Sequence, residues 1–393
     1  MKHLKLFSAA IACSLVLLSG CKKETDLGVN PTSTQQDSQL SVAAQENLDQ
    51  LRASLPADAA EKIKQGSPLL PTTHPQYREM VQRAMKVIAP TACDDNTPVN
   101  QWFSQQLNGW TLAIYNTALN VGMLDLPTYD ALVFENSSEN QYYGVNGEYT
   151  QQLTKTFKDL KRFWDIESDN IIMAAMHGSM LQDRNKLIRT YEAAFGMNST
   201  LAAAYADYVI ALLKAYPQYR NGNHPIFTFN AFAQSGFNFG PYGIIPDKII
   251  MGDGIMEAYA ATGYADIAPQ AILAHEFAHH IQFDLNLFAS GPRTPEATRR
   301  TELMADAYAA YYLSHARGAA MQWKRVQQFL QVFFNIGDCG FTSTGHHGTP
   351  TQRMAAAEWA YNLANDAQKQ GHILSSQEFA ALFEAQLPGL VLQ

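Results

Sequence analysis

One apolar segment, Pro269–Ile281, carries three histidines and a glutamate, and this combination constrains the fold more than any other feature. The segment predicts a helix, because Asp266 can cap it and Pro269 suits its first turn. A core-facing stripe with helical spacing supports this, formed by Ala274, Phe277, Ala278 and Ile281. The helix is apolar on much of its remaining surface too, so we expect it to be buried. Imidazoles and a carboxylate buried in it would need partners.

Two of these histidines, His275 and His279, stand four residues apart, with Glu276 beside the first. Residues at this spacing lie on one face of a helix, so both rings can converge on one ion. This HExxH pattern is typical of zinc sites that activate water. A metal would supply the partners that burial demands. The alternative is a pair of core histidines held by other polar groups.

A second predicted helix follows, capped by Thr294, starting at Pro295 and ending before Gly318. Glu302 and Asp306 lie on one face of it, among residues too apolar for a solvated helix. We expect Glu302 to be the third zinc ligand and Asp306 to accept the N–H of a zinc histidine. The alternative is a solvated acidic edge.

Together these motifs resemble the gluzincin metallopeptidases, in particular the neutral zinc metallopeptidases of bacteria. The resemblance spans about residues 244–359 and rests on His275–His280, Glu302–Asp306 and His347–Arg353. It implies a mainly α (α+β), zincin-like fold, a helical bundle with a small β-sheet edge beside the active-site helix. It also implies one Zn²⁺ ion held by His275, His279 and Glu302, with Glu276 as catalytic base. His280 departs from the pattern, because an uncharged residue is usual there and its protonation would perturb the site.

The implied chemistry is hydrolysis of a peptide bond by metal-activated water, with Glu276 as general base. A further donor to the developing oxyanion is expected, and the candidates are His346, His347 and Tyr308. Arg353 is expected instead to dock its loop through a carboxylate. Two other functions stay open: a lipoprotein whose zinc is structural or serves binding without catalysis, and an amide hydrolase acting on cell-wall components.

The N-terminus predicts a lipoprotein signal peptide. Residues 1–20 join a basic start to an apolar run, Leu6–Leu18, that is too short to span a bilayer. The sequence Leu18-Ser19-Gly20-Cys21 is a lipobox, so we expect cleavage before Cys21 and lipidation of its thiol. The mature protein would then be anchored to a membrane of the cell envelope. Lys22 favours the outer membrane if the envelope is Gram-negative.

Cleavage would remove Lys2 and Lys5 and no acidic residue, taking the formal charge from −8 to −10. An acidic protein lacks the electrostatic footprint of nucleic-acid binding, so the expected partner is a peptide or protein substrate. Cleavage would also remove Cys13, and lipidation would use the thiol of Cys21. Cys93 and Cys339 would remain, and in an oxidising compartment we expect them to form a disulfide. The alternative is two buried thiols.

The sequence divides into a signal peptide (1–20), a lipidated N-terminus with a flexible tether (21–74) and a globular domain (75–393). The resemblance to zincins implies that this domain has two lobes. The N-terminal part of this domain, about 75–220, is expected to be helical, and periodicity predicts helices over 102–118, 151–163, 168–180, 186–195 and 200–216. Three methionines in the third of these, Met173, Met176 and Met180, are expected in the core. Strands are expected within Phe227–Phe239 and Ile244–Met251. The resemblance to zincins implies that the second forms the cleft edge, where an extended peptide can pair.

Overall fold

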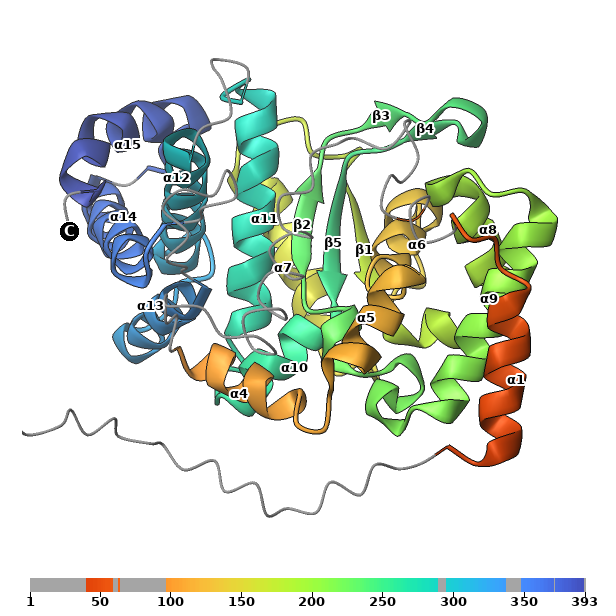
Figure 1. The fold of residues 1–393 in the computed structure, drawn as a ribbon. Coiled ribbons are helices and arrows are strands. Elements are labelled where there is room, and N and C mark those ends of the chain that lie inside the picture. Colours follow the sequence, from red (N-terminus) through yellow and green to blue (C-terminus); the bar gives the residue numbers. More distant parts are fainter. Residues whose placement is uncertain are drawn as a thin grey trace, which may run out of the picture. The chain divides into compact units, whose positions relative to one another are not determined.

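Helices predominate in the computed structural model, which describes residues 40–58, 63, 97–288, 295–336, 348–370 and 372–391. Contacts divide the chain into Met1–Ser41, of which only Leu40 and Ser41 are described, and Val42–Gln393. In the second unit the helices accompany a three-stranded mixed sheet and a separate two-stranded sheet (Figure 1). The predicted fold class, mainly helical with a small sheet, is confirmed. The expected division into two lobes stays a prediction.

The first half of this unit is largely helical. Its helices are α1 (Val42–Ala53), α4 (Pro98–Gln106), α5 (Leu112–Asn120), α6 (Leu126–Phe134), α7 (Thr150–Phe163), α8 (Arg184–Phe195) and α9 (Ser199–Ala215), with short 3-10 turns η1 (Gly178–Gln182), η2 (Pro217–Gly222), η3 (Pro225–Phe227) and η4 (Gly240–Tyr242). Helices α7, α8 and α9 match predicted ranges. The single helix predicted over 102–118 is two helices, because Gly109 adopts a positive φ and Thr111 caps a new helix by accepting the backbone N–H of Ile114.

Helix α1 lies within the segment that the sequence predicts to be a tether. It packs against α9 and buries Leu48. Burial of this apolar surface favours a fixed position over a free one. Helix α1 therefore belongs to the unit Val42–Gln393.

The three-stranded sheet has the order β1 (Ile172–Met176), β5 (Lys248–Gly252), β2 (Ala231–Gln234). Strands β1 and β5 run parallel and β2 is antiparallel to β5. The helix predicted over 168–180 is therefore wrong. Met173 and Met176 are buried as predicted, but they belong to a strand whose last four residues are all buried. A strand covered on both faces loses the alternation that would distinguish it from a buried helix.

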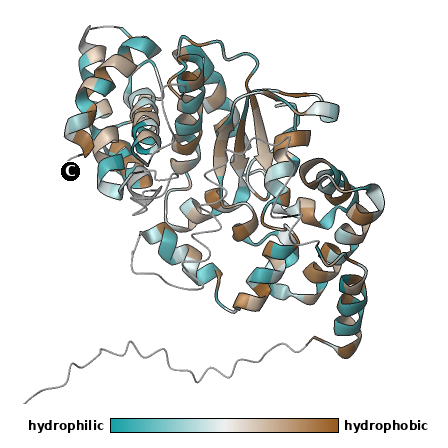
Figure 2. Cartoon of the chain, turned by 45° about the horizontal axis from the view of Figure 1, so that its top comes forward, coloured by the Kyte–Doolittle hydropathy of each residue, from teal (hydrophilic) through white to brown (hydrophobic). Residues whose placement is uncertain are grey.

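Strand β5 occupies the centre of the sheet, so the prediction that Ile244–Met251 forms a cleft edge is wrong. All five residues of β5 are buried. The start of the predicted run is a separate strand, β4 (Ile244–Ile245), which pairs with β3 (Phe237–Asn238). The central sheet is brown over much of its length in Figure 2, whereas the surrounding helices mix teal and brown. The strand that lies beside the next long helix, α11, is β2 (Figure 1).

The second half of the unit consists of helices that carry the predicted site. They are α10 (Asp253–Ala261), α11 (Ala268–Asp284), α12 (Pro295–Ser314), α13 (Trp323–Ile336), α14 (Pro350–Gln370) and α15 (Ser376–Val391). Helix α12 packs against both α11 and α14, and α11 lies between α12 and the sheet (Figure 1). Within the described part of the chain, no helix combines the length and apolarity needed to cross a membrane.

Helix α11 is buried over nearly its whole surface, as its apolar sequence predicts. Pro269 lies in its first turn, but the cap is Ile267 and not Asp266. The Asp266 carboxylate instead forms an ion pair with Arg325 of α13. The helix therefore starts without a side-chain cap, and its position is set by packing.

His224 is a buried imidazole outside this group of helices. Its Nδ1 accepts the backbone N–H of Ile226 at 3.1 Å, so the proton is on Nε2, which donates to the Gln106 carbonyl oxygen at 2.8 Å. Burial lowers the pKa of His224 to about 4. The bond from Ile226 requires the neutral ring, because a proton on Nδ1 would face another N–H.

This histidine should make the stability of the protein sensitive to acid. As the pH falls below about 6.5, the unfolded chain takes up a proton that folded His224 resists, so the free energy of unfolding decreases until about pH 4. The loss should reach up to about 3 kcal/mol. Urea unfolding between pH 4 and 7 would measure it. A His224→Gln variant should show a shallower dependence, whereas replacing the exposed His372 should leave it unchanged; an unaltered slope in His224→Gln would contradict the prediction.

Candidate metal centre

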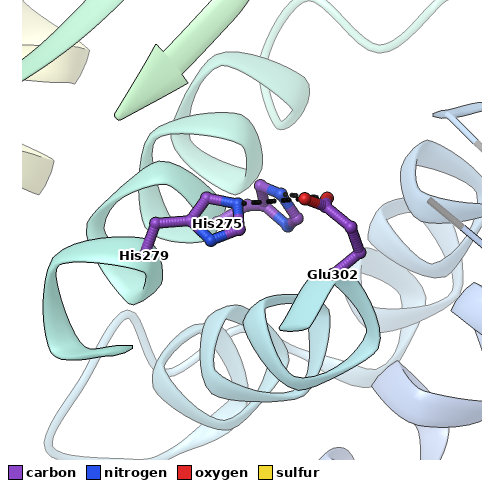
Figure 3. Close-up of side chains that lie close together, drawn as sticks. All are labelled: His275, His279 and Glu302. Atoms are coloured by element: carbon purple, nitrogen blue, oxygen red, sulfur yellow. Dashed lines mark ion pairs between the residues drawn. The ribbon is translucent and has the colours of Figure 1, made fainter. Parts of the chain in front are cut away.

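Three side chains from two helices converge at one point. The imidazoles of His275 and His279 project from α11 toward the carboxylate of Glu302 on α12 (Figure 3). All three side chains are buried, with exposed fractions of 5, 5 and 6 %. One potential ligand atom from each of the three side chains lies within 4.8 Å of the other two. The described residues contain no second such group of three or more histidine, cysteine or acidic side chains.

The spacing of these atoms fits a single small ion. Two ligands about 2.1 Å from a tetrahedral zinc ion lie about 3.4 Å apart. The Nε2 of His275 is 3.3 Å from Oε2 of Glu302, and the Nε2 of His279 is 3.6 Å from Oε1 of the same carboxylate. Two imidazoles and a carboxylate are also donors that suit zinc. The described residues thus supply three of the four ligands that zinc prefers.

The Nδ1 atom of His275, the ring nitrogen that does not face Glu302, lies beside a buried ion pair. Its Nδ1 lies 2.8 Å from Oδ1 of Asp306, the contact expected from the sequence. Arg353 of α14 holds the same carboxylate in a bidentate pair, with Nη2 at 2.6 Å and Nε at 2.7 Å. Asp306 and Arg353 are both fully buried. The Asp306 contact orients the ring so that Nε2 faces the ion position.

The charges around His275 favour its protonated form when no metal competes. Burial alone lowers the pKa of His275, but hydrogen bonds to the carboxylates of Asp306 and Glu302 outweigh it and raise the value to about 9. The negative charge of Glu276 acts in the same direction. A metal ion bound at Nε2 would have to displace this proton.

The outer nitrogen of His279 has a neutral partner. Its Nδ1 lies 2.9 Å from Oε1 of Gln282, whose Nε2 donates to the carbonyl oxygen of Thr301 at 2.7 Å. Sequence reasoning missed Gln282. The available signal was an amide three residues after His279, on the same face of an apolar helix, where it must find partners.

His280 contacts the central strand and is not one of the three candidate metal ligands. Its Nε2 donates to the carbonyl oxygen of Lys248 in β5 at 2.9 Å. Burial lowers the pKa of His280, so the ring stays neutral near pH 7. Its protonation is therefore disfavoured, and the residue joins α11 to the central strand.

Among the predicted oxyanion donors, Tyr308 is the one that the structure describes. Its hydroxyl donates to the carbonyl oxygen of Ser376 at 2.6 Å, and its ring packs on Phe379 with centroids 4.4 Å apart. This bond uses the only hydroxyl proton, which disfavours the predicted role. His346 and His347 lie outside the described residues.

The predicted lipid and disulfide positions also fall outside the described residues. Cys21, Cys93 and Cys339 all belong to the segments that are not described. Lipidation of the first and a bond between the other two therefore stay predictions.

Glu276 completes the predicted constellation. It follows His275 on α11, and only 4 % of its surface is exposed.

Comparison of the chain with known protein families, with curated proteins and with solved structures finds no match. What the described residues support is a buried His275–His279–Glu302 group able to hold one metal ion.

Proposed function

We propose that the protein is a zinc-dependent hydrolase that cleaves peptide bonds. The observation that carries this proposal is the buried group of His275, His279 and Glu302, with both Nε2 atoms directed at one carboxylate. The HExxH…ExxxD pattern and its resemblance to gluzincin peptidases support the choice of zinc and of peptide substrates.

Each residue of the site would have a distinct task. A zinc ion, when bound, lowers the pKa of water and polarises a carbonyl oxygen. Glu276, adjacent to the ligands but not needed as one, would take the proton of the attacking water on its carboxylate and return it to the leaving amine nitrogen. Asp306 and Gln282 would hold the two imidazoles in place throughout.

A purely structural zinc site is the main alternative. Structural sites are closed by four protein ligands, whereas the described residues supply three and place a buried glutamate next to them. This difference favours catalysis. An amide in a cell-wall component would be cleaved by the same chemistry, so substrate assays have to include it.

Removal of the metal should abolish activity reversibly. We expect the purified protein to cleave a mixed peptide library, to lose this activity after treatment with a chelator, and to regain it when zinc is added. Mass spectrometry of the products measures all three states. Cleavage that persists after complete zinc removal would contradict the proposal. A zinc-loaded protein that cleaves cell-wall amides but no peptide would replace the substrate class, and one that cleaves neither would favour a structural or binding site.

A further inference from the structure

The two candidate metal ligands on α11 are held by chemically different partners. The ring of His275 contacts the carboxylate of Asp306, which carries a full charge and is paired with Arg353. The ring of His279 contacts the neutral amide of Gln282. Gln282 is fully buried, and both ends of its amide are used.

The direction of the Gln282 amide follows from its second contact. The carbonyl oxygen of Thr301 can only accept, so the end of the amide that faces it must be the NH₂ group. The amide oxygen therefore faces His279, whose Nδ1 must carry the proton. Because a neutral imidazole carries one proton, the lone pair of His279 is on Nε2, the atom that faces Glu302.

The same amide also connects the two ligand-bearing helices. Thr301, which accepts its N–H, directly precedes Glu302 on α12, whereas Gln282 and His279 lie on α11. One side chain thus selects the tautomer of the second histidine and fixes the backbone next to the third ligand. A hydrocarbon of the same size could fill the space but could do neither.

We propose that Gln282 is a positioning residue for metal capture, which sets the tautomer of His279 and its placement relative to Glu302. This inference rests on the proposed metal site but not on catalysis. It predicts that the amide matters for affinity even when the protein is folded and no substrate is present. Contacts of this kind typically change metal affinity by about 10- to 100-fold.

The test compares two variants at this position with a matched control. Gln282→Met keeps the length of the side chain and removes both hydrogen bonds. Gln282→Glu keeps an acceptor for His279 but places a carboxylate against the Thr301 carbonyl oxygen. The control is Gln270→Met on the same helix, which removes an amide that donates to the Asp266 carbonyl oxygen at the surface. Full-length proteins are compared by zinc affinity in chelator competition, by the visible spectrum of the cobalt form, and by unfolding of the metal-free form.

Gln282→Met should bind zinc about 10- to 100-fold more weakly than the native protein and should shift the cobalt spectrum, while the control changes neither. Gln282→Glu should lose less affinity than Gln282→Met, because His279 keeps a partner, and its added charge should also shift the spectrum. If Gln282→Met does not fold, the cobalt spectrum of Gln282→Glu is the test: a shifted spectrum supports the inference and a native spectrum overturns it. Native affinity and a native cobalt spectrum in the folded variants would overturn the inference. None of these readouts uses turnover, so the absence of peptidase activity in the native protein would refute the proposed function alone.

Discussion

Replacing Glu276 with glutamine should reduce peptide hydrolysis by at least about 10²- to 10⁴-fold, the range attributed to general acid–base catalysis. Glutamine has the same shape but cannot take up a proton from water. Because His275, His279 and Glu302 form the ligand group without Glu276, the variant should keep its zinc and its fold. Elemental analysis and peptide hydrolysis on the same purified sample would measure both properties.

A second glutamate provides the matched comparison. Glu302→Ala removes a ligand atom that lies 3.3 Å from Nε2 of His275, so zinc content and activity should fall together. Two chemically identical side chains would then separate into a proton carrier and a metal ligand. Loss of zinc from Glu276→Gln, or near-native turnover by it, would show that the assigned roles are wrong.

Replacing Arg353 with methionine should destabilise the folded protein by about 3–5 kcal/mol, the cost typical of removing one partner from a buried ion pair. Arg353 and Asp306 are both fully buried and share two short hydrogen bonds. In the variant, the Asp306 carboxylate would keep the contact with His275 but lose its guanidinium. Urea unfolding of the metal-free protein at constant pH would measure the loss.

An exposed pair and a double variant serve as controls for this experiment. Arg184 pairs with Asp207 at the surface with similar geometry, so Arg184→Met should leave stability nearly unchanged. Combining Arg353→Met with Asp306→Leu removes both buried charges and should recover part of the lost stability. The zinc affinity of the double variant should be lower than that of the native protein, because His275 would lack its orienting carboxylate. A single Arg353→Met variant as stable as the native protein would contradict this account.

The metal group was predictable because its determinants are local. The spacing of His275 and His279 and the apolar residues between them place both rings on one face of a buried helix. The same spacing relates Glu302 to Asp306, and the structure places the second against His275 as expected. What could not follow from spacing alone is the distance between the two helices, which packing determines.

The central sheet shows where periodicity fails. Helical spacing of Met173 and Met176 predicted a helix, but burial on both faces makes a short strand equally apolar at every position. The same reasoning applies to β5, where the uninterrupted apolar residues Ile249–Met251 are typical of a central strand and not of an exposed edge. In both strands, consecutive apolar residues remove the alternation of apolar and polar residues that would identify a strand.

Partners distant in sequence were the hardest to predict. Arg353 was expected to pair with a carboxylate, but only the packing of α14 on α12 identifies that carboxylate as Asp306. Gln282 has one partner of each kind. Its contact with His279 is local, whereas its contact with Thr301 crosses between helices. Such contacts depend on tertiary structure that no short pattern encodes.

Formation of the candidate metal centre during synthesis should depend on the ion pair between Asp306 and Arg353. Helices α11 and α12 are complete at Ser314, yet the guanidinium that neutralises Asp306 follows that carboxylate by 47 residues. A nascent chain that ends before α14 would hold the three candidate ligands beside a buried Asp306 that lacks its guanidinium partner, which disfavours the docked arrangement. Assembly of the centre would therefore wait for the C-terminal helices. A chain that has not yet completed α14 should therefore hold a metal ion at His275, His279 and Glu302 more weakly than the finished chain.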